Sequence, residues 1–224
     1  MTDPPVTRGA VRWYGAHQHA ILFYSILLTL AAAPVLGSLR RDGALLELFL
    51  ALNLSAAVLR REHRGRHWAP ALTLVGVIGL RLLAGALDSP GLRSLAHALW
   101  IGLALLAAVG TVRFALRGRG VSAEHLYAAL SAYLLAGVFF GVLYDLMGRV
   151  SPAAFAAGGA AIDLTPASAI YFSFVTLATL GYGDIVPATD VARGVAVVEA
   201  VAGQLYVAVM IARLVSLYAR RGEG

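Results

Sequence analysis

Residues 179–184 carry the clearest chemistry in this chain. They are Thr179, Leu180, Gly181, Tyr182, Gly183 and Asp184, and they lie between two apolar stretches. A dehydrated monovalent cation needs oxygen atoms in place of its water shell, and backbone carbonyls that face one side of a strand can supply them in successive rings. Carbonyls that all face one way require left-handed backbone angles at alternate positions, which glycine adopts without strain. The spacing of Gly181 and Gly183 therefore predicts a cation-binding strand.

Each residue of this strand has an expected role. We expect potassium ions at the backbone carbonyls of residues 179–182, with the Thr179 hydroxyl closing the innermost site. Tyr182 is expected to press the strand outward against surrounding side chains, and Asp184 lies where the chain leaves the strand. The alternative is an ordinary turn in a soluble loop. Gly-x-Gly between two apolar segments favours the membrane interpretation, where open backbone has a use.

The strand needs one short and one long helix to position it. The apolar segment 167–178 falls short of the roughly 20 residues that span a bilayer, so it is expected to enter the membrane and return. Pro166 is suited to the first position of this helix. The long helix is predicted at 191–218. Such a re-entrant segment is tolerated only when protein or water covers its backbone, which predicts an oligomer.

Composition places the chain in a bilayer. Of its 224 residues 59% are hydrophobic and 13% are charged, with a mean hydropathy of +0.77, well above soluble globular domains. Cysteine is absent, which excludes disulfides and thiolate metal sites. The net charge of +6 comes from arginine alone among the basic residues. In a membrane protein this charge sets topology, so no nucleic-acid partner is expected.

The apolar segments predict an all-α membrane protein with six transmembrane helices, a re-entrant helix and a filter loop. The expected spans are 19–36, 44–59, 68–87, 92–116, 123–147 and 191–218. Arginine-rich loops at 60–66 and 117–119 then lie in the cytoplasm with both termini, as the positive-inside rule requires. Segment 148–165 is expected to form an extracellular, Ala/Gly-rich turret. The first span also resembles a secretory signal with a cleavage site near 31–33, an alternative that stays open.

The motif at 179–184, with Pro187 and Gly203 downstream, resembles the tetrameric potassium channels of the six-helix bacterial type with one pore loop. The likeness is specific over about 166–218 and general elsewhere. Leu180 replaces the commoner Val of this family, which the carbonyl cage should tolerate because the side chain points away from the ion. The resemblance implies a four-helix, sensor-like region at 1–120 and a pore domain at 121–224 that passes K⁺ passively across the cell membrane, without enzymatic activity or cofactor. Because the family arrangement needs four filter strands around an axis, it also implies a homotetramer, which is the working assumption. The sequence does not indicate an accessory subunit.

The fourth span lacks a voltage sensor's charges. No arginine lies between Arg93 and Arg113, whereas a sensor helix carries several within the membrane. We therefore expect a channel that is not strongly voltage-gated. The alternatives are a poorly selective cation channel, a subunit of a potassium-uptake transporter and a non-conducting scaffold. The intact Gly-Tyr-Gly-Asp argues against the first, and the single pore loop argues against the second.

Other polar or small residues in the spans have two interpretations each. Arg81 and Glu47 are expected at similar depth and to pair, either to hold the helix bundle together or to take part in gating. Gly203 is expected to serve as a hinge or as a close-packing glycine of the last helix.

Glu199 lies one turn before Gly203, and a buried carboxyl there must be paired or neutral. The hydroxyls of Ser173 and Thr176 are the expected partners, so that Glu199 braces the strand 179–184 through its protonation state. The alternative is a ring of carboxylates facing the aqueous cavity. In the resembling family an acid often stands behind the filter at the position of Val175. Asp184 is therefore expected to use Tyr171 as its partner instead.

Overall fold

A computed structural model describes residues 17–33, 49–50, 52–54, 75–76, 79–80, 83, 90–117 and 123–219. Most of the expected spans 44–59 and 68–87, together with Glu47 and Arg81, lie outside these residues. The described elements are a helix at His17–Ala33, then α4 (Pro90–Arg117), α5 (Ala123–Val150), β1 (Phe155–Ala157), β2 (Ala160–Ala161), α6 (Pro166–Leu177), β3 (Val186–Pro187) and α7 (Asp190–Ala219).

Three helices in the described part of the chain are long and apolar enough to cross a membrane. They cover Leu95–Leu116, Ala123–Val150 and Asp190–Arg213. The helices His17–Ala33 and Pro166–Leu177 are apolar but shorter. The expected fourth, fifth and sixth spans thus correspond to α4, α5 and α7, while the full set of six stays a prediction.

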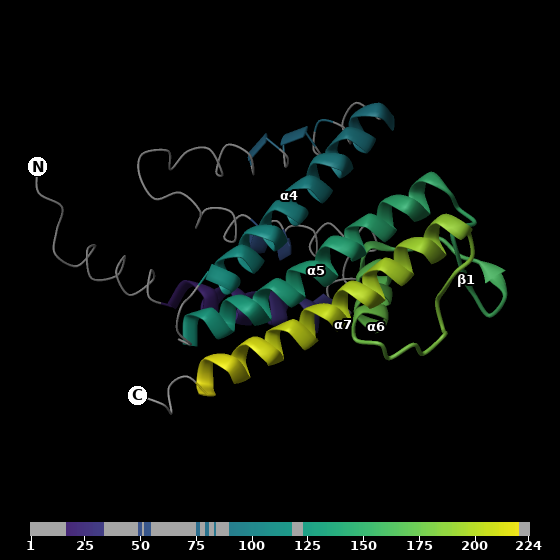
Figure 1. The fold of residues 1–224 in the computed structure, drawn as a ribbon. Helices are drawn as coiled ribbons and strands as arrows, with labels where there is room; N and C mark the ends of the chain where they lie inside the picture. The colour runs from purple at the N-terminus through teal and green to yellow at the C-terminus, as the bar shows by residue number, and fades with distance from the viewer. Residues whose placement is uncertain are drawn as a thin grey trace, which may run out of the picture.

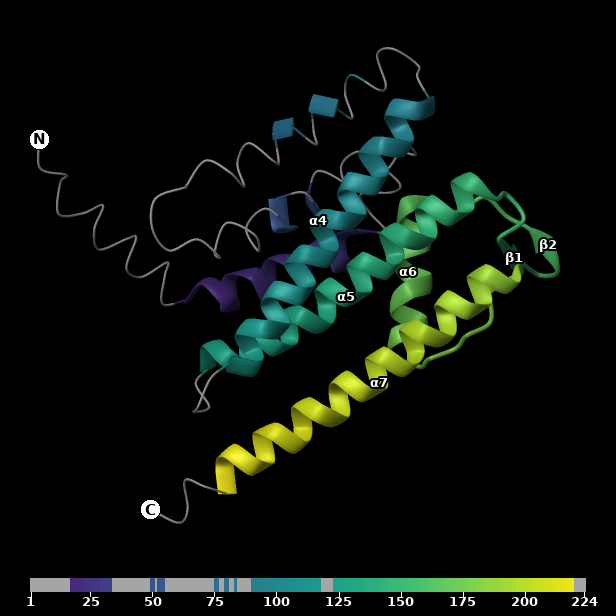
Figure 2. The same ribbon diagram turned by 45° about the horizontal axis from the view of Figure 1, so that its top comes forward.

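Helix α5 is the centre of the arrangement. It packs against α4, against the short helix α6, and against α7 (Figures 1 and 2). Strands β1 and β2 lie at the end of the molecule where α5 ends and α7 begins (Figure 2), and β3 pairs with β1 there. One core cluster joins His17–Ala33, α4, α5 and α6 through Leu22, Ile26, Leu103, Leu135 and Ile170, among others. Helix α6 is thereby packed against α5 and the rest of this cluster.

Local signals explain where α6 begins. Thr165 is its N-cap and Pro166 opens the helix, as the sequence predicts. The Thr165 side chain accepts a hydrogen bond from the Ser168 backbone N–H at 3.1 Å, and the Thr165 N–H donates to the Ser168 hydroxyl at 2.8 Å. These reciprocal bonds form a capping box, which satisfies two backbone donors of the helix start. At 12 residues, α6 is about 18 Å long, too short to span the roughly 30 Å of hydrocarbon.

Two glycines let α6 approach α5 closely. A Cβ at Gly141 would lie 2.9 Å from the Cα of Ile170, and a Cβ at Gly137 would lie 2.6 Å from the Phe174 ring. Neither distance accommodates a side chain without movement of a neighbour. Small residues at such positions allow helix backbones to come together in a membrane. The position of α6 is therefore set by direct contact with α5.

The prediction of an all-α protein did not include a small three-stranded sheet. Two of its strands, β1 and β2, lie in the turret, and β3 lies after residues 179–184. Its strand order is β2-β1-β3, with both pairs antiparallel. Between β1 and β2, Gly158 and Gly159 have φ of 57° and 84°, which suits a two-residue hairpin turn. On the other side of β1, Phe155 stands opposite Pro187 and Ala156 opposite Val186. The chain that leaves residues 179–184 is thus tied to the turret.

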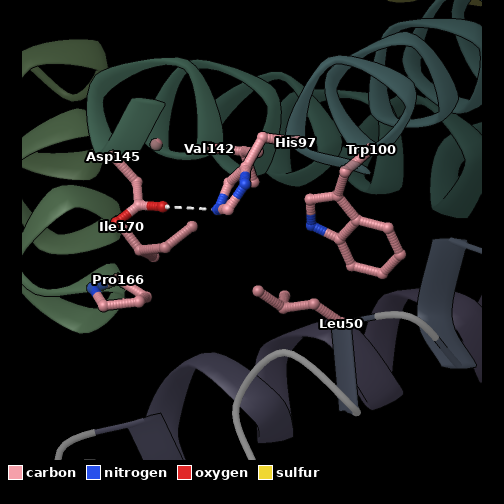
Figure 3. A pocket seen from close by; sticks show the side chains of 8 residues that line it. Leu50, His97, Trp100, Val142, Asp145, Pro166 and Ile170 are labelled. Atoms are coloured by element: carbon pink, nitrogen blue, oxygen red, sulfur yellow. Dashed lines mark ion pairs between the residues drawn. The ribbon is translucent and has the colours of Figure 1, made fainter. Parts of the chain in front are cut away.

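A polar cluster of buried Asp145 and His97 with the partly exposed Arg149 joins α4 to α5 beside the start of α6. Asp145 accepts hydrogen bonds from the Arg149 guanidinium at 2.9 and 3.2 Å, and its Oδ2 lies 3.7 Å from the Nε2 of His97 (Figure 3). A cavity of about 20 Å³ next to them is lined by Leu50, Trp100, Pro166 and Ile170, among others. This space suffices for about one water molecule. The N-terminal half of α4, the C-terminal half of α5 and the start of α6 meet here.

Candidate functional site

Every second residue from 179 to 183 has a left-handed backbone conformation, with positive φ. Thr179, Gly181 and Gly183 have φ of 57°, 58° and 74°. The expected left-handed angles at Gly181 and Gly183 are present, and Thr179 adds a third position that the sequence did not indicate. A left-handed residue other than glycine costs roughly 1–2 kcal/mol. The Thr179 N–H donates to the Thr176 carbonyl at 3.0 Å, which helps to hold this conformation.

Hydrogen bonds to the end of α6 set the direction of the first carbonyls. The N–H groups of Leu180 and Gly181 both donate to the carbonyl oxygen of Val175, at 2.9 and 3.4 Å. In a trans peptide the carbonyl points opposite to the N–H of the same unit. The carbonyls of Thr179 and Leu180 share their peptide units with these two N–H groups, so both point away from α6. Successive oxygens on one side are what a dehydrated cation requires.

Two large side chains of this segment are mostly exposed in the structure. Leu180 is 56% exposed and Tyr182 is 66% exposed. Tyr182 is thus mostly exposed in a single chain, and its expected wedging role against surrounding side chains stays a prediction. A membrane does not tolerate open, lipid-exposed backbone. Such backbone must be buried in protein or line water, and the oligomer that would cover it stays a prediction.

Asp184 has the partner expected from the sequence. The Tyr171 hydroxyl donates to Asp184 Oδ2 at 2.7 Å. This hydrogen bond is the main cause that holds the pKa of Asp184 below its usual range, and backbone N–H donors add to the effect. The bond stabilises the charged carboxylate and joins α6 to the chain just after Gly183.

Replacing Tyr171 by Phe is expected to make the site more sensitive to acid. The pKa of Asp184 is lowered in the folded protein, so the stabilisation is present above the unfolded pKa and is lost as pH falls through the folded pKa. Without the hydroxyl the folded pKa rises, and acid disturbs the site from a higher pH. The measurement is ionic current through the reconstituted protein as the external pH is lowered, with Tyr127→Phe, a tyrosine on α5 remote from this site, as control. Equal pH midpoints for Tyr171→Phe and the unaltered protein would contradict this.

Behind α6 the structure brings three polar side chains together. Glu199 of α7, Tyr144 of α5 and Ser173 of α6 are all fully buried. The Tyr144 hydroxyl donates to Glu199 Oε2 at 2.7 Å, and the Ser173 hydroxyl lies within hydrogen-bond distance of Oε1, at 2.5 Å. Burial among the helices rules out the alternative in which Glu199 faces an aqueous cavity.

The expected partners of Glu199 need one correction and one addition. Ser173 is a partner, but among the described residues no hydrogen bond joins Thr176 to Glu199; the second carboxyl oxygen is bonded by Tyr144 instead. The sequence did not lead us to Tyr144. The feature that could have indicated Tyr144 is a phenol in an otherwise apolar span, because a buried tyrosine hydroxyl usually finds a hydrogen-bond partner.

Gly203 is a contact point at the base of the site. A Cβ there would lie 2.7 Å from Leu177 Cδ1 and 2.9 Å from the Leu177 carbonyl oxygen. The same oxygen accepts a hydrogen bond from the Tyr133 hydroxyl at 3.2 Å. Of the two expected roles of Gly203, close packing is therefore visible in the structure. It lets α7 touch the last residue of α6.

Comparison with known proteins gives one match. Residues 128–220 match the family model described as "Ion channel", which includes most of α5, all of α6, the segment 179–184 and α7. No curated protein and no solved structure matches the chain. The match supports an ion channel family, and the apolar helices support a membrane location. The comparison and the apolar helices thus indicate the class of a membrane protein with a region similar to ion channel domains.

Proposed function

We propose that this protein is a potassium-selective channel whose filter is the segment 179–184, here called the filter. Potassium ions bind the carbonyls of residues 179–182 and the Thr179 hydroxyl, and move down their electrochemical gradient without a chemical step. The observation that carries the proposal is the alternation of left-handed residues at 179, 181 and 183, with the first carbonyls pointing away from α6. Rings of such oxygens replace the hydration shell of potassium.

The proposal includes a homotetramer in the cell membrane, with both termini in the cytoplasm. One chain contributes one filter strand, and rings of carbonyls need several copies around an axis. Exposed apolar side chains on α7 support further contacts with lipid or other subunits; they include Val197, Val201, Leu205 and Ile211. Lipid and permeant ions are the partners that this function requires.

Reversal potentials test the proposal. The protein is reconstituted in planar bilayers with potassium on one side and sodium on the other. We expect currents that reverse close to the potassium equilibrium potential. Currents that reverse near zero would favour the poorly selective cation channel. Uptake that needs a second, coupled ion would favour the transporter subunit, and the absence of current from folded protein would favour the scaffold.

Weak voltage dependence is expected from the same recordings. Moving one charge across the membrane is worth roughly 2.3 kcal/mol per 100 mV, and steep gating needs several such charges per subunit. Within the span Leu95–Leu116 of α4, Arg113 is the sole arginine and lies near the end. The open probability should therefore change shallowly over a test range of about 100 mV on either side of zero. A steep conductance–voltage curve would contradict this expectation.

A further inference from the structure

The buried cluster of Glu199, Tyr144 and Ser173 joins three helices at one point. Each residue comes from a different helix, and each is fully buried. The Ser173 hydroxyl also lies 2.8 Å from the Gly137 carbonyl oxygen of α5. The cluster therefore links α7 to α5 and α6 through polar contacts in a region that is otherwise apolar. Polar groups in such surroundings are costly when their partners are lost.

The number of available protons determines which group donates each hydrogen bond in the cluster. A serine hydroxyl has one proton, so Ser173 cannot donate to both Gly137 and Glu199 at once. All groups are satisfied when the Glu199 carboxyl carries a proton and donates it to Ser173, whose own proton goes to Gly137. Among the residues that the structure describes, Glu199 has no ion-pair partner, and an unpaired buried charge is far too costly. The structure assigns a neutral carboxylic acid to this position.

The cluster reaches both ends of the filter. On the inner side, Ser173 belongs to α6, whose last turn holds the first filter residues. On the outer side, the Tyr144 ring packs edge-on against Phe172 and Phe155, with ring centroids 4.9 and 5.6 Å away. Phe155 of β1 stands opposite Pro187 of β3. Strand β3 follows the filter in the chain. Glu199 is thus connected to the segments before and after the filter.

We propose that Glu199 is a positioning residue for conduction, which holds α5 and α6 through Tyr144 and Ser173 and so keeps the filter in its conducting conformation. This inference rests on the proposed channel function. Glu199 does not touch the ion path, since it is buried behind α6. Its loss should therefore change how long the filter stays open and leave the current through an open filter unchanged.

Single-channel recording of four variants tests this role. Glu199→Ala and Tyr144→Phe remove hydrogen bonds of the cluster, and a lost buried partner is worth enough to shorten the mean open time by about tenfold or more. Unit conductance should stay the same. Glu199→Gln should retain nearly unaltered open times, because its amide oxygen can accept from Tyr144 while its NH₂ donates to Ser173. Single-channel recordings detect only assembled channels. A variant that merely folds poorly therefore gives fewer channels, and the open times of those channels are normal.

Tyr206→Phe, the fourth variant, is the matched control. Tyr206 lies on the same helix as Glu199, and its hydroxyl donates to the Ala129 carbonyl of α5 at 2.6 Å, without a bond to α6. It should leave open times unchanged. If Glu199→Ala yields no channels, the open times of Tyr144→Phe test the positioning role, because this variant removes only one hydroxyl group from the cluster.

Three results would overturn the positioning role. They are normal open times in Tyr144→Phe, equal shortening in Tyr206→Phe, and reduced unit conductance with unchanged openings. Absence of potassium-selective current from the unaltered protein would instead overturn the proposed function.

Discussion

Gly183→Ala is expected to abolish potassium conduction. Gly183 has φ of 74°, and a Cβ added there would meet no other atom of its own chain within 4 Å, so backbone conformation and not local crowding is the obstacle. A left-handed alanine costs roughly 1–2 kcal/mol, and four subunits multiply this to about 4–8 kcal/mol per channel. Relief of that strain turns carbonyls away from the ion. Gly181→Ala, at φ of 58°, should act in the same way.

The turret supplies a control for this prediction. Gly158 has φ of 57° and equally open surroundings, but lies in the hairpin turn between β1 and β2. Gly158→Ala therefore adds the same backbone strain outside the filter. We expect Gly158→Ala to conduct with unaltered selectivity, measured by reversal potentials under a potassium/sodium gradient. Normal conduction by Gly183→Ala would show that 179–184 is not the filter.

Gly203→Ala is expected to destabilise the protein and to reduce conduction. Its Cβ would meet the Leu177 carbonyl oxygen at 2.9 Å, and backbone cannot move aside as a flexible side chain can. Overpacking of this kind costs typically about 1–3 kcal/mol. Leu177 is the last residue of α6 and accepts the Tyr133 hydrogen bond, so its displacement also disturbs the base of the filter. Thermal unfolding in detergent and current amplitude measure the two effects.

Gly194→Ala separates crowding from helix propensity. Gly194 lies on the same helix with nothing within 4 Å of its Cβ position. Both substitutions gain the roughly 1 kcal/mol by which alanine exceeds glycine in a helix. Gly194→Ala should therefore be neutral or stabilising, while Gly203→Ala should unfold at a lower temperature. Equal stability of the two variants would contradict close packing between α7 and the end of α6.

The elements that the sequence predicts correctly are those with local signals. Long apolar runs predict α4, α5 and α7, because backbone in hydrocarbon must satisfy its own hydrogen bonds within a helix. Pro166 marks the start of α6, and the glycine spacing marks the left-handed positions 181 and 183. The small sheet gives no such signal, since its strands are short and its hairpin is rich in alanine and glycine. It forms because the chain returns from the filter and brings Val186 beside Ala156.

The contacts around the filter were decided by the tertiary structure. Composition and position suggested that Glu199 is buried and that Ser173 is within its reach. The partnership with Tyr144, 55 residues away in the chain, depends on how closely α5, α6 and α7 approach one another. That approach is set by the missing side chains of Gly137, Gly141 and Gly203, and by the packing of aromatic rings around Tyr144. Hydrogen bonds and close contacts are formed over a few ångströms, and no pattern within one helix specifies the distance between two.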